Sequence, residues 1–245
     1  MPASKIKPII RDLAHSNWHI HTCGSNCASK DMTVANIVKS AESAGLETLA
    51  LTDHHYPKQD ILKNVENIKH AVSSCGTKVK IYVGAELSAV GPGIYADSEE
   101  INRRIPYRLY ATNHYHWGSW SHPLDRSPHG YAMHQCKILK KLVLSGRADC
   151  IAHPFQGVYL QGIIKDPELV TKTLADEEIA SVLSLGLGKT AWEISTRHLL
   201  KDIEFARRYI SIGLELGVSF RLGTDAHCLK DVDPKDAMEH LVRLL

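Results

Sequence analysis

Short apolar segments alternate with longer amphipathic segments along nearly the whole chain, and this alternation restricts the fold more than any other feature. It is typical of repeated βα units, whose strands pair in parallel. A chain of 245 residues suits either two small domains or one α/β barrel. Because no linker or low-complexity tract separates the units, we predict a single domain. The predicted strands number seven and cover residues 18–21, 48–51, 79–83, 108–111, 149–152, 191–194 and 218–222.

Helical patterns fill the intervals between these strands. Apolar residues recur there at helical spacing, and Gly45, Gly76 and Gly217 mark helix ends. The predicted helices cover residues 34–44, 60–75 and 130–144, part of 167–185, 199–216, and the chain from about 234 to its end. We predict irregular structure for residues 88–106, which contain Gly-Pro-Gly. Residues 1–16 then form an N-terminal extension, and residues 17–245 form the domain.

Charge and composition exclude several classes of protein. Lys and Arg number 29 and Asp and Glu 27, a net charge of +2 that argues against long nucleic acid as a partner. No apolar run reaches the roughly 18 residues of a membrane helix, and the N-terminus lacks the apolar core of a signal peptide. The six cysteines form no CxxC pair, so we expect free thiols. These features predict a cytoplasmic protein that binds no membrane, while the sequence leaves the oligomeric state open.

Side chains that commonly bind metals follow one predicted strand after another. Histidine is frequent, with 15 of 245 residues, and it is well suited to metal ligation and proton transfer. The strand-end set consists of His19, His21, Asp53, His54, Glu86, His114, His153, Asp225 and His227. In a parallel barrel the carboxyl ends of all strands open onto one face. We therefore predict that these residues meet in one site.

The spacing within this set supports a metal site. His19 and His21 lie on the same side of an extended strand, because side chains alternate with a period of two, and Asp225 and His227 repeat that spacing. Taken singly, each residue has an ordinary structural explanation: Glu86, for example, could pair with an arginine. The regular progression over successive strands favours the metal site.

Seven motifs in a fixed order carry a resemblance to a known family. They are WHIHT, LTDHH, VGAEL, ATNHYH, IAHPF, WEIST and LGTDAH. In this order they resemble the polymerase and histidinol phosphatase (PHP) superfamily, over residues 17–230. The resemblance implies an α/β fold, a distorted (β/α)7 barrel. It also implies a cofactor of two or three divalent metal ions, which could be Zn, Mn or Fe.

The resemblance also implies a role for each ligand. His19, His21, Glu86 and Asp225 would hold one metal. Glu86 would bridge to a second metal bound by His114 and His153, and His54 and His227 would hold a third. Here the chain departs from the family, which usually adds an acidic residue or a histidine to the third site. The segment CGSNCASKD offers Asn26, Cys27 or Asp31 instead, or the third metal is labile.

Three nearby residues are kept out of the predicted ligand set. His116 lies one alternation from His114 and competes with it for the ligand role, and the family match favours His114. Asp53 is expected to orient an imidazole or to cap a backbone turn. Glu193, at the end of the sixth strand, aligns with a supporting acidic position of the family.

The implied activity is that of a phosphoric ester hydrolase. Clustered divalent ions make hydroxide available at neutral pH and neutralise phosphoryl oxygens during in-line attack. Glu86 would hold the ions around the hydroxide, and Asp225 or His227 would move protons to the leaving group. Arg197 is the predicted substrate-binding residue, although it could instead pair with an acidic group on the next helix. Arg103, Arg104 and Arg108, together with Trp117 and the loop after it, could form a lid.

Three functions remain open at this stage. The first is a phosphatase that resembles histidinol phosphatase and hydrolyses a small phosphate monoester. The second is a phosphodiesterase or exonuclease that acts on nucleotides or short oligonucleotides, because near-neutral charge disfavours long polymers. The third is a metal-binding module without turnover.

Overall fold

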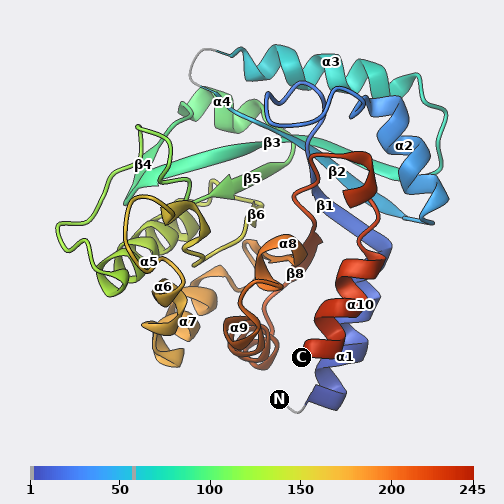
Figure 1. Ribbon diagram of the computed structural model, residues 1–245. Helices are drawn as coiled ribbons and strands as arrows, with labels where there is room; N and C mark the ends of the chain where they lie inside the picture. Colours follow the sequence, from blue (N-terminus) through green and yellow to red (C-terminus); the bar gives the residue numbers. More distant parts are fainter. Residues whose placement is uncertain (1–2, 57–58) are drawn as a thin grey trace.

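A parallel sheet that curls into a nearly closed barrel forms the centre of the molecule (Figure 1). The computed structural model describes residues 3–56 and 59–245. Seven parallel strands follow the order β1-β2-β3-β5-β6-β7-β8, and β4 pairs antiparallel with β3. The bounds are β1 Ser16–Ile20, β2 Thr48–His54, β3 Lys80–Gly91, β4 Ile94–Tyr95, β5 Arg108–Ala111, β6 Cys150–Ile151, β7 Ala191–Ser195 and β8 Phe220–Gly223.

The first and last strands meet just beyond their carboxyl ends. A parallel bridge joins Ile20 to Ala226, and the N–H of Ala226 donates to the carbonyl of His19 at 3.1 Å. The N–H of His21 donates in turn to the carbonyl of Ala226 at 3.0 Å. These bonds bring the predicted ligands after β1 and those after β8 together. The strand order and this closure confirm the predicted α/β barrel of seven parallel strands in one domain.

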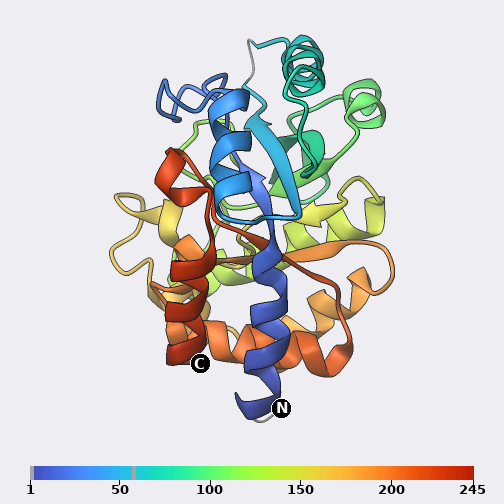
Figure 2. The same cartoon turned by 90° about the vertical axis from the view of Figure 1, so that its right-hand side faces the viewer.

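Helices surround the barrel (Figures 1 and 2). Their bounds are α1 Ala3–Asp12, α2 Val34–Ser43, α3 Ile61–Ser73, α4 Glu99–Arg104, α5 Pro128–Ser145, α6 Leu169–Lys172, α7 Asp176–Leu183, α8 Thr196–Leu199, α9 Ile203–Leu216 and α10 Lys235–Leu244. Short 3₁₀ helices cover Leu13–His15, Val158–Leu160, Ser184–Gly186 and Leu229–Asp231. Among the described residues, no helix is both long and apolar enough to cross a membrane.

The prediction of irregular structure for residues 88–106 is wrong. Strand β3 continues to Gly91, turns at Gly93 with φ of +76°, and returns as β4. Helix α4 follows, and the side chain of Ser98 caps it by accepting from the N–H of Ile101. A Gly-Pro-Gly sequence therefore marks a tight hairpin here, because glycine adopts positive φ without strain.

The predicted helix at 199–216 begins later, at Ile203, because Leu199 belongs to a separate short helix. Helix α8 ends at Leu199, and Asp202 starts α9 by accepting from the N–H of Phe205. An aspartate at this position satisfies one of the free N–H groups of the first turn. The division leaves residues 196–199 as a short helix directly after β7, where its side chains face the mouth of the barrel.

Residues 3–12 of the predicted N-terminal extension form helix α1, which lies beside α10 (Figures 1 and 2). Ile6 and Ile10 are buried, and Arg11 forms an ion pair with Glu239 at 2.7 Å. Residues 1 and 2 of that extension lie outside the described residues. Helix α1 thus covers apolar surface near the other end of the chain.

Aromatic residues fill the amino-terminal end of the barrel. The guanidinium of Arg221 lies 4.1 Å from the ring centre of Trp18 and 5.1 Å from that of Tyr107. Gly84 makes this packing possible, because a Cβ atom there would lie only 1.9 Å from the carbonyl oxygen of Tyr107. Aromatic rings thus fill the amino-terminal end of the barrel, and the predicted metal ligands lie at its carboxyl end.

Candidate metal centre

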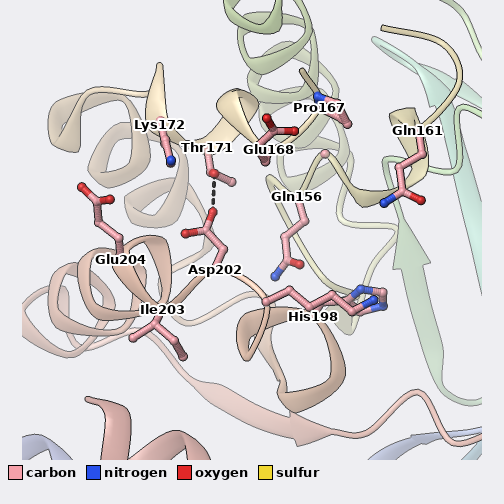
Figure 3. Close-up of a pocket in the computed structure, with 12 residues that line it drawn as sticks. Gln156, Gln161, Pro167, Glu168, Thr171, Lys172, His198, Asp202, Ile203 and Glu204 are labelled. Carbon is pink, nitrogen blue, oxygen red and sulfur yellow. Dashed lines mark hydrogen bonds between the residues drawn. The ribbon is translucent and has the colours of Figure 1, made fainter. Parts of the chain in front are cut away.

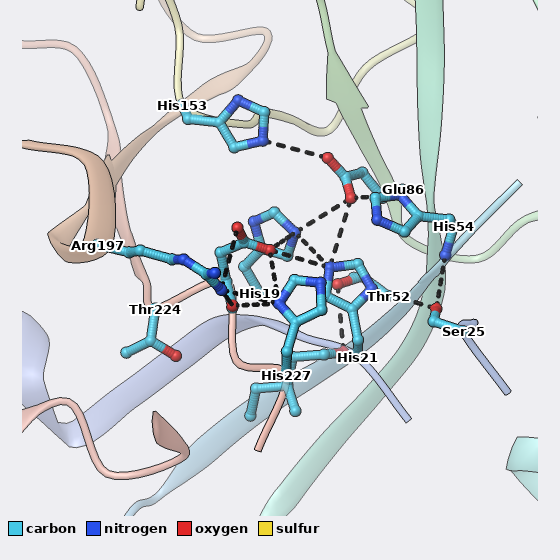
Figure 4. A network of polar contacts seen from close by, with 12 residues as sticks. His19, His21, Ser25, Thr52, His54, Glu86, His153, Arg197, Thr224 and His227 are labelled. Atoms are coloured by element: carbon cyan, nitrogen blue, oxygen red, sulfur yellow. Dashed lines mark hydrogen bonds and ion pairs between the residues drawn. The ribbon is translucent and has the colours of Figure 1, made fainter. Parts of the chain in front are cut away.

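All eight predicted metal ligands lie at the carboxyl end of the barrel, and Figure 4 shows the arrangement of His19, His21, His54, Glu86, His153 and His227. His227 is partly exposed, and the other seven are buried, none with more than 7% of its surface exposed. The set comprises His19, His21, His54, Glu86, His114, His153, Asp225 and His227. A buried group of this kind is costly unless its members are paired or hold a metal.

Glu86 lies at the centre of the cluster. Its Oε2 is 2.8 Å from Nδ1 of His54 and 3.3 Å from Nε2 of His19. Its Oε1 is 3.3 Å from Nε2 of His153 and 3.7 Å from Nε2 of His114. Glu86 lies within β3 rather than after its end, and it pairs in register with His54 of β2. Paired residues on neighbouring parallel strands point to the same side, which explains the contact between them.

Asp225 is the second carboxylate of the cluster. Its Oδ1 lies 3.1 Å from Nε2 of His21 and 3.4 Å from Nε2 of His19. Its backbone has φ of +53°, and that of His153 has φ of +29°, values that are unusual for residues other than glycine. Such strain is commonly retained at functional sites.

Three groups of side chains place their ligand atoms within 4.8 Å of one another. They are His19 with His21 and Asp225, His54 with Glu86 and His114, and His21 with His54 and His227. The first group lies within the first site that the family resemblance implies. The second contains His54 in place of His153, and the third adds His21 to the implied pair His54 and His227. The chain therefore has several clusters that could bind more than one metal ion.

The donor set fits divalent metals. It combines imidazole nitrogens with carboxylate oxygens, and this mixture suits zinc, manganese or iron. The Nε2 atoms of His19 and His21 lie only 3.1 Å apart and face the same carboxylates, an arrangement that a cation stabilises.

Side chains on the far side from the centre orient His19 and His153. Nδ1 of His19 lies 2.8 Å from Oε1 of Glu193, and the N–H of His153 donates to Oε2 of Glu193 at 2.6 Å. Nδ1 of His153 lies 3.0 Å from the side-chain oxygen of Asn113. These contacts leave both Nε2 atoms facing the centre. The structure supports the interpretation of Glu193 as a supporting residue.

Asp53 serves the loop after β1 rather than the centre. Its carboxylate accepts from the N–H and the hydroxyl of Thr22, both at 2.6 Å, and from the amide of Asn64 at 2.9 Å. These bonds fix the backbone next to His21. The predicted role of Asp53 in capping a backbone turn is thereby confirmed.

Cys27 is the residue offered for the third metal site that lies against the group of His21, His54 and His227. Its Sγ is 3.1 Å from Nε2 of His227 and 3.6 Å from the hydroxyl of Tyr56. Burial raises the pKa of the Cys27 thiol, but hydrogen bonds with His227 and His54 outweigh it and bring the pKa to about 6. Asp31, in contrast, accepts a hydrogen bond from the hydroxyl of Ser29.

Electrostatics keep the carboxylates ionised. Burial alone would raise the pKa of Glu86, but His54 and His19 hold that pKa well below its usual range. The same balance, with His19 as the main favourable neighbour, lowers the pKa of Asp225 well below its usual range. Burial lowers the pKa of His21 to about 3, so this imidazole is neutral. Burial lowers the pKa of His54, but Glu86 outweighs it and raises that pKa to about 10, and Glu193 and Glu86 likewise outweigh burial and raise the pKa of His19 above its usual range. Because metals bind neutral imidazoles, a metal that enters the centre displaces protons from these two histidines.

Arg197 and His198 extend from α8 toward the centre. Nη1 of Arg197 donates to the carbonyl of Asp225 at 3.0 Å and lies 3.0 Å from Nδ1 of His227. Nε2 of His198 lies 3.3 Å from Oδ2 of Asp225. Sequence reasoning missed His198, because its position depends on the division between α8 and α9.

Aromatic side chains line the outer part of the site. The ring centres of Trp117 and His114 lie 4.8 Å apart, and those of Tyr159 and His114 lie 4.6 Å apart. His116 is exposed and stacks on Tyr159 at 5.0 Å, which agrees with the choice of His114 as the buried ligand candidate. Arg108 lies at the opposite end, where it begins β5 and pairs with Asp149. The arginine part of the predicted lid is thus not supported at Arg108.

Comparison with known proteins relates the fold to solved structures. The chain is similar to the putative histidinol phosphatase hisK from Listeria monocytogenes, with a TM-score of 0.59, 12% identity, and coverage of 88% of this chain and 96% of that chain. At this identity the likeness shows the fold alone. No protein-family model and no curated protein matches the sequence. The barrel therefore agrees with the PHP fold that the motifs imply, and it carries buried His, Asp and Glu clusters as metal-site candidates.

Proposed function

We propose that this protein is a metal-dependent phosphoesterase that hydrolyses a small phosphate monoester. The observation that carries the proposal is the position of Glu86, whose carboxylate lies within 3.7 Å of the imidazoles of His19, His21, His54, His114 and His153. Divalent ions at such a centre lower the pKa of water and neutralise the charge of a phosphoryl group. Zn, Mn and Fe all suit these ligands.

The chain's own residues account for the rest of the reaction. Arg197 has 46% of its side chain exposed at the edge of the centre, so its guanidinium is available to bind a phosphate dianion. Trp117 and Tyr159 pack against the ring of His114 and so cover part of the buried histidine cluster. In this proposal His227, which lies beside Arg197, moves a proton to the departing alcohol.

The test is hydrolysis by purified protein reconstituted with manganese or zinc. We expect turnover of p-nitrophenyl phosphate, weaker turnover of bis(p-nitrophenyl) phosphate, and loss of both after chelation. Asp225→Asn is expected to lower kcat by about 100-fold or more, because it removes charge from the centre. Asp236→Asn, an exposed aspartate on α10, is the matched control and should retain activity.

The other outcomes separate the competing functions. A preference for the diester would favour a phosphodiesterase that acts on nucleotides or short oligonucleotides. Metal binding without hydrolysis of any ester above the Asp225→Asn background would favour a non-catalytic metal-binding module and contradict the proposal.

A further inference from the structure

A cavity of about 510 Å³ lies beside the metal centre, between α6, α9 and the chain after β6 (Figure 3). This volume is in the range of small-molecule sites. Its lining consists of Gln156, Gly157, Gln161, Pro167, Glu168, Thr171, Lys172, His198, Lys201, Asp202, Ile203 and Glu204. None of the predicted metal ligands lines this cavity, and the proposed hydrolysis of the phosphate ester does not use it.

His198 is shared by the cavity and the metal centre. Its imidazole lines the cavity, while its Nε2 lies 3.3 Å from Oδ2 of Asp225 and 3.5 Å from the hydroxyl of Tyr159. The side chain is buried, and its Nδ1 has no hydrogen-bond partner among residues 3–56 and 59–245. The same imidazole thus contacts the predicted ligand Asp225 and lines the cavity, so the cavity adjoins the metal centre.

Polar side chains dominate the lining. Gln156 is 5% exposed as a residue, and its side-chain amide, which can donate and accept hydrogen bonds, points into the cavity (Figure 3). Nδ1 of His198 is a buried polar atom of this lining without a partner among the described residues, so a ligand group that hydrogen-bonds to it would stabilise the site. Asp202, by comparison, is already engaged, because it accepts from Thr171 and from the N–H of Phe205.

The charges of the lining nearly balance. The lining carries two lysines, Lys172 and Lys201, and three acidic residues, Glu168, Asp202 and Glu204, so it has no positive surplus that would favour an anion. A flat apolar ligand would leave these groups and the amide of Gln156 without partners. Hydroxyl groups both donate and accept, so a neutral ligand with several hydroxyls matches the lining.

We propose that this cavity binds the organic part of the substrate and that this part is a polyhydroxylated alcohol, as in a sugar phosphate. The proposal rests on the proposed phosphoesterase function. It places the phosphate at the metal centre beside Arg197, and the hydroxyls of the departing alcohol against Gln156 and the lysines of the cavity lining.

The experiment compares glucose 6-phosphate with p-nitrophenyl phosphate, using metal-loaded protein and three variants. Gln156→Leu removes the amide that points into the cavity, and Lys201→Met removes a charge from its lining. Lys189→Met is the matched control, because Lys189 is exposed and lies outside the cavity lining. We expect Gln156→Leu to lower kcat/KM for glucose 6-phosphate about 10-fold or more, chiefly through KM, because each lost hydrogen bond is worth about that factor. Turnover of p-nitrophenyl phosphate should change by less than about twofold.

Calorimetric titration of the metal-loaded protein with glucose 6-phosphate separates the two proposals. If no ester is hydrolysed but the sugar phosphate binds and Gln156→Leu weakens binding, the phosphoesterase function fails and the cavity assignment stands. If p-nitrophenyl phosphate is hydrolysed but Gln156→Leu affects both substrates equally, the cavity assignment is overturned. A preference of the wild type for histidinol phosphate that Gln156→Leu leaves unchanged would also overturn it.

Discussion

At the scale of single residues, Glu193 and Gly223 show how the centre is held. Glu193 contacts His19 and His153 with its two oxygens. Gly223 leaves room for that carboxylate, because a Cβ atom there would lie 1.9 Å from Oε1 of Glu193. The orientation of the two histidines thus depends on residues that do not face the centre themselves. Groups that orient metal ligands typically affect affinity as much as some ligands do.

Replacing Glu193 tests this support. Glu193→Gln keeps the shape of the side chain but removes the charge that orients the imidazole of His19. We expect metal affinity to fall by about 10- to 100-fold, measured by competition with a chromophoric chelator. Glu177→Gln, an exposed glutamate on α7, should bind metal as the wild type does. Equal affinities in the two variants would contradict the role of Glu193.

At the scale of elements, helices close the barrel's outer surface and fix its loops. Helix α1 packs beside α10 although the two lie at opposite ends of the sequence (Figure 2). Helix α5 packs against the loop after β5, where Nε2 of His134 lies 3.2 Å from the hydroxyl of Ser121. Both contacts join segments that the pattern of apolar residues does not relate to each other.

Two neighbouring isoleucines test the contribution of α1. Ile10 is fully buried, whereas Ile9 is 42% exposed. Ile10→Ala is expected to lower the free energy of unfolding by about 2 to 4 kcal/mol, because it leaves a cavity in the packed interface. Ile9→Ala should cost about 0.5 kcal/mol or less. Urea denaturation of both variants gives the comparison, and equal losses would show that α1 is not packed as described.

His134 predicts a pH dependence for α5. Burial, followed by the charge of Lys137, lowers the pKa of His134 to about 4. The unfolded chain takes up this proton near pH 6.5 and the folded protein near pH 4, so stability falls as pH decreases through that window. Between pH 7 and pH 5 this loss is about 1 to 2 kcal/mol. His134→Gln should remove that part of the slope in denaturation at the two pH values, and an unchanged slope would refute the assignment.

At the scale of the whole molecule, barrel closure creates the centre. His19 of β1 and His21 just after it lie next to Asp225 and His227, which follow β8, because Ile20 and Ala226 form a bridge. The resulting cluster contains two ionised carboxylates among six imidazoles in a mostly buried space. A metal ion that binds there stabilises the folded protein as a whole, since the unfolded chain has no such cluster.

Metal removal should therefore lower the melting temperature. At a free metal concentration of 100 times Kd, binding contributes about 2.7 kcal/mol to stability. We expect Tm to fall after dialysis against a chelator and to recover with zinc or manganese, as followed by calorimetry. In His21→Gln the difference in Tm between metal-loaded and metal-free protein should become smaller. In His240→Gln, which alters an exposed residue of α10, that difference should stay the same. A wild-type Tm that is indifferent to metal would argue against an occupied centre.

The sequence by itself determined the number and order of the parallel strands and the identity of the residues that gather at their ends. The strands follow from local periodicity, because apolar runs mark strands and glycines mark the ends of the helices between them. The shared site follows because the carboxyl ends of parallel strands in a barrel open onto one face. The role of Asp53 at a backbone turn could likewise be predicted, since its neighbours lie at the end of a strand.

Only the tertiary structure decided how those residues are arranged and what surrounds them. The pairing of His54 with Glu86 depends on the register between β2 and β3, which no local pattern reveals. His198 reaches Asp225 because Asp202 starts a new helix and leaves α8 at the barrel mouth. The cavity beside it joins elements that are separated in the chain, and packing between distant segments cannot be derived from periodicity along one of them.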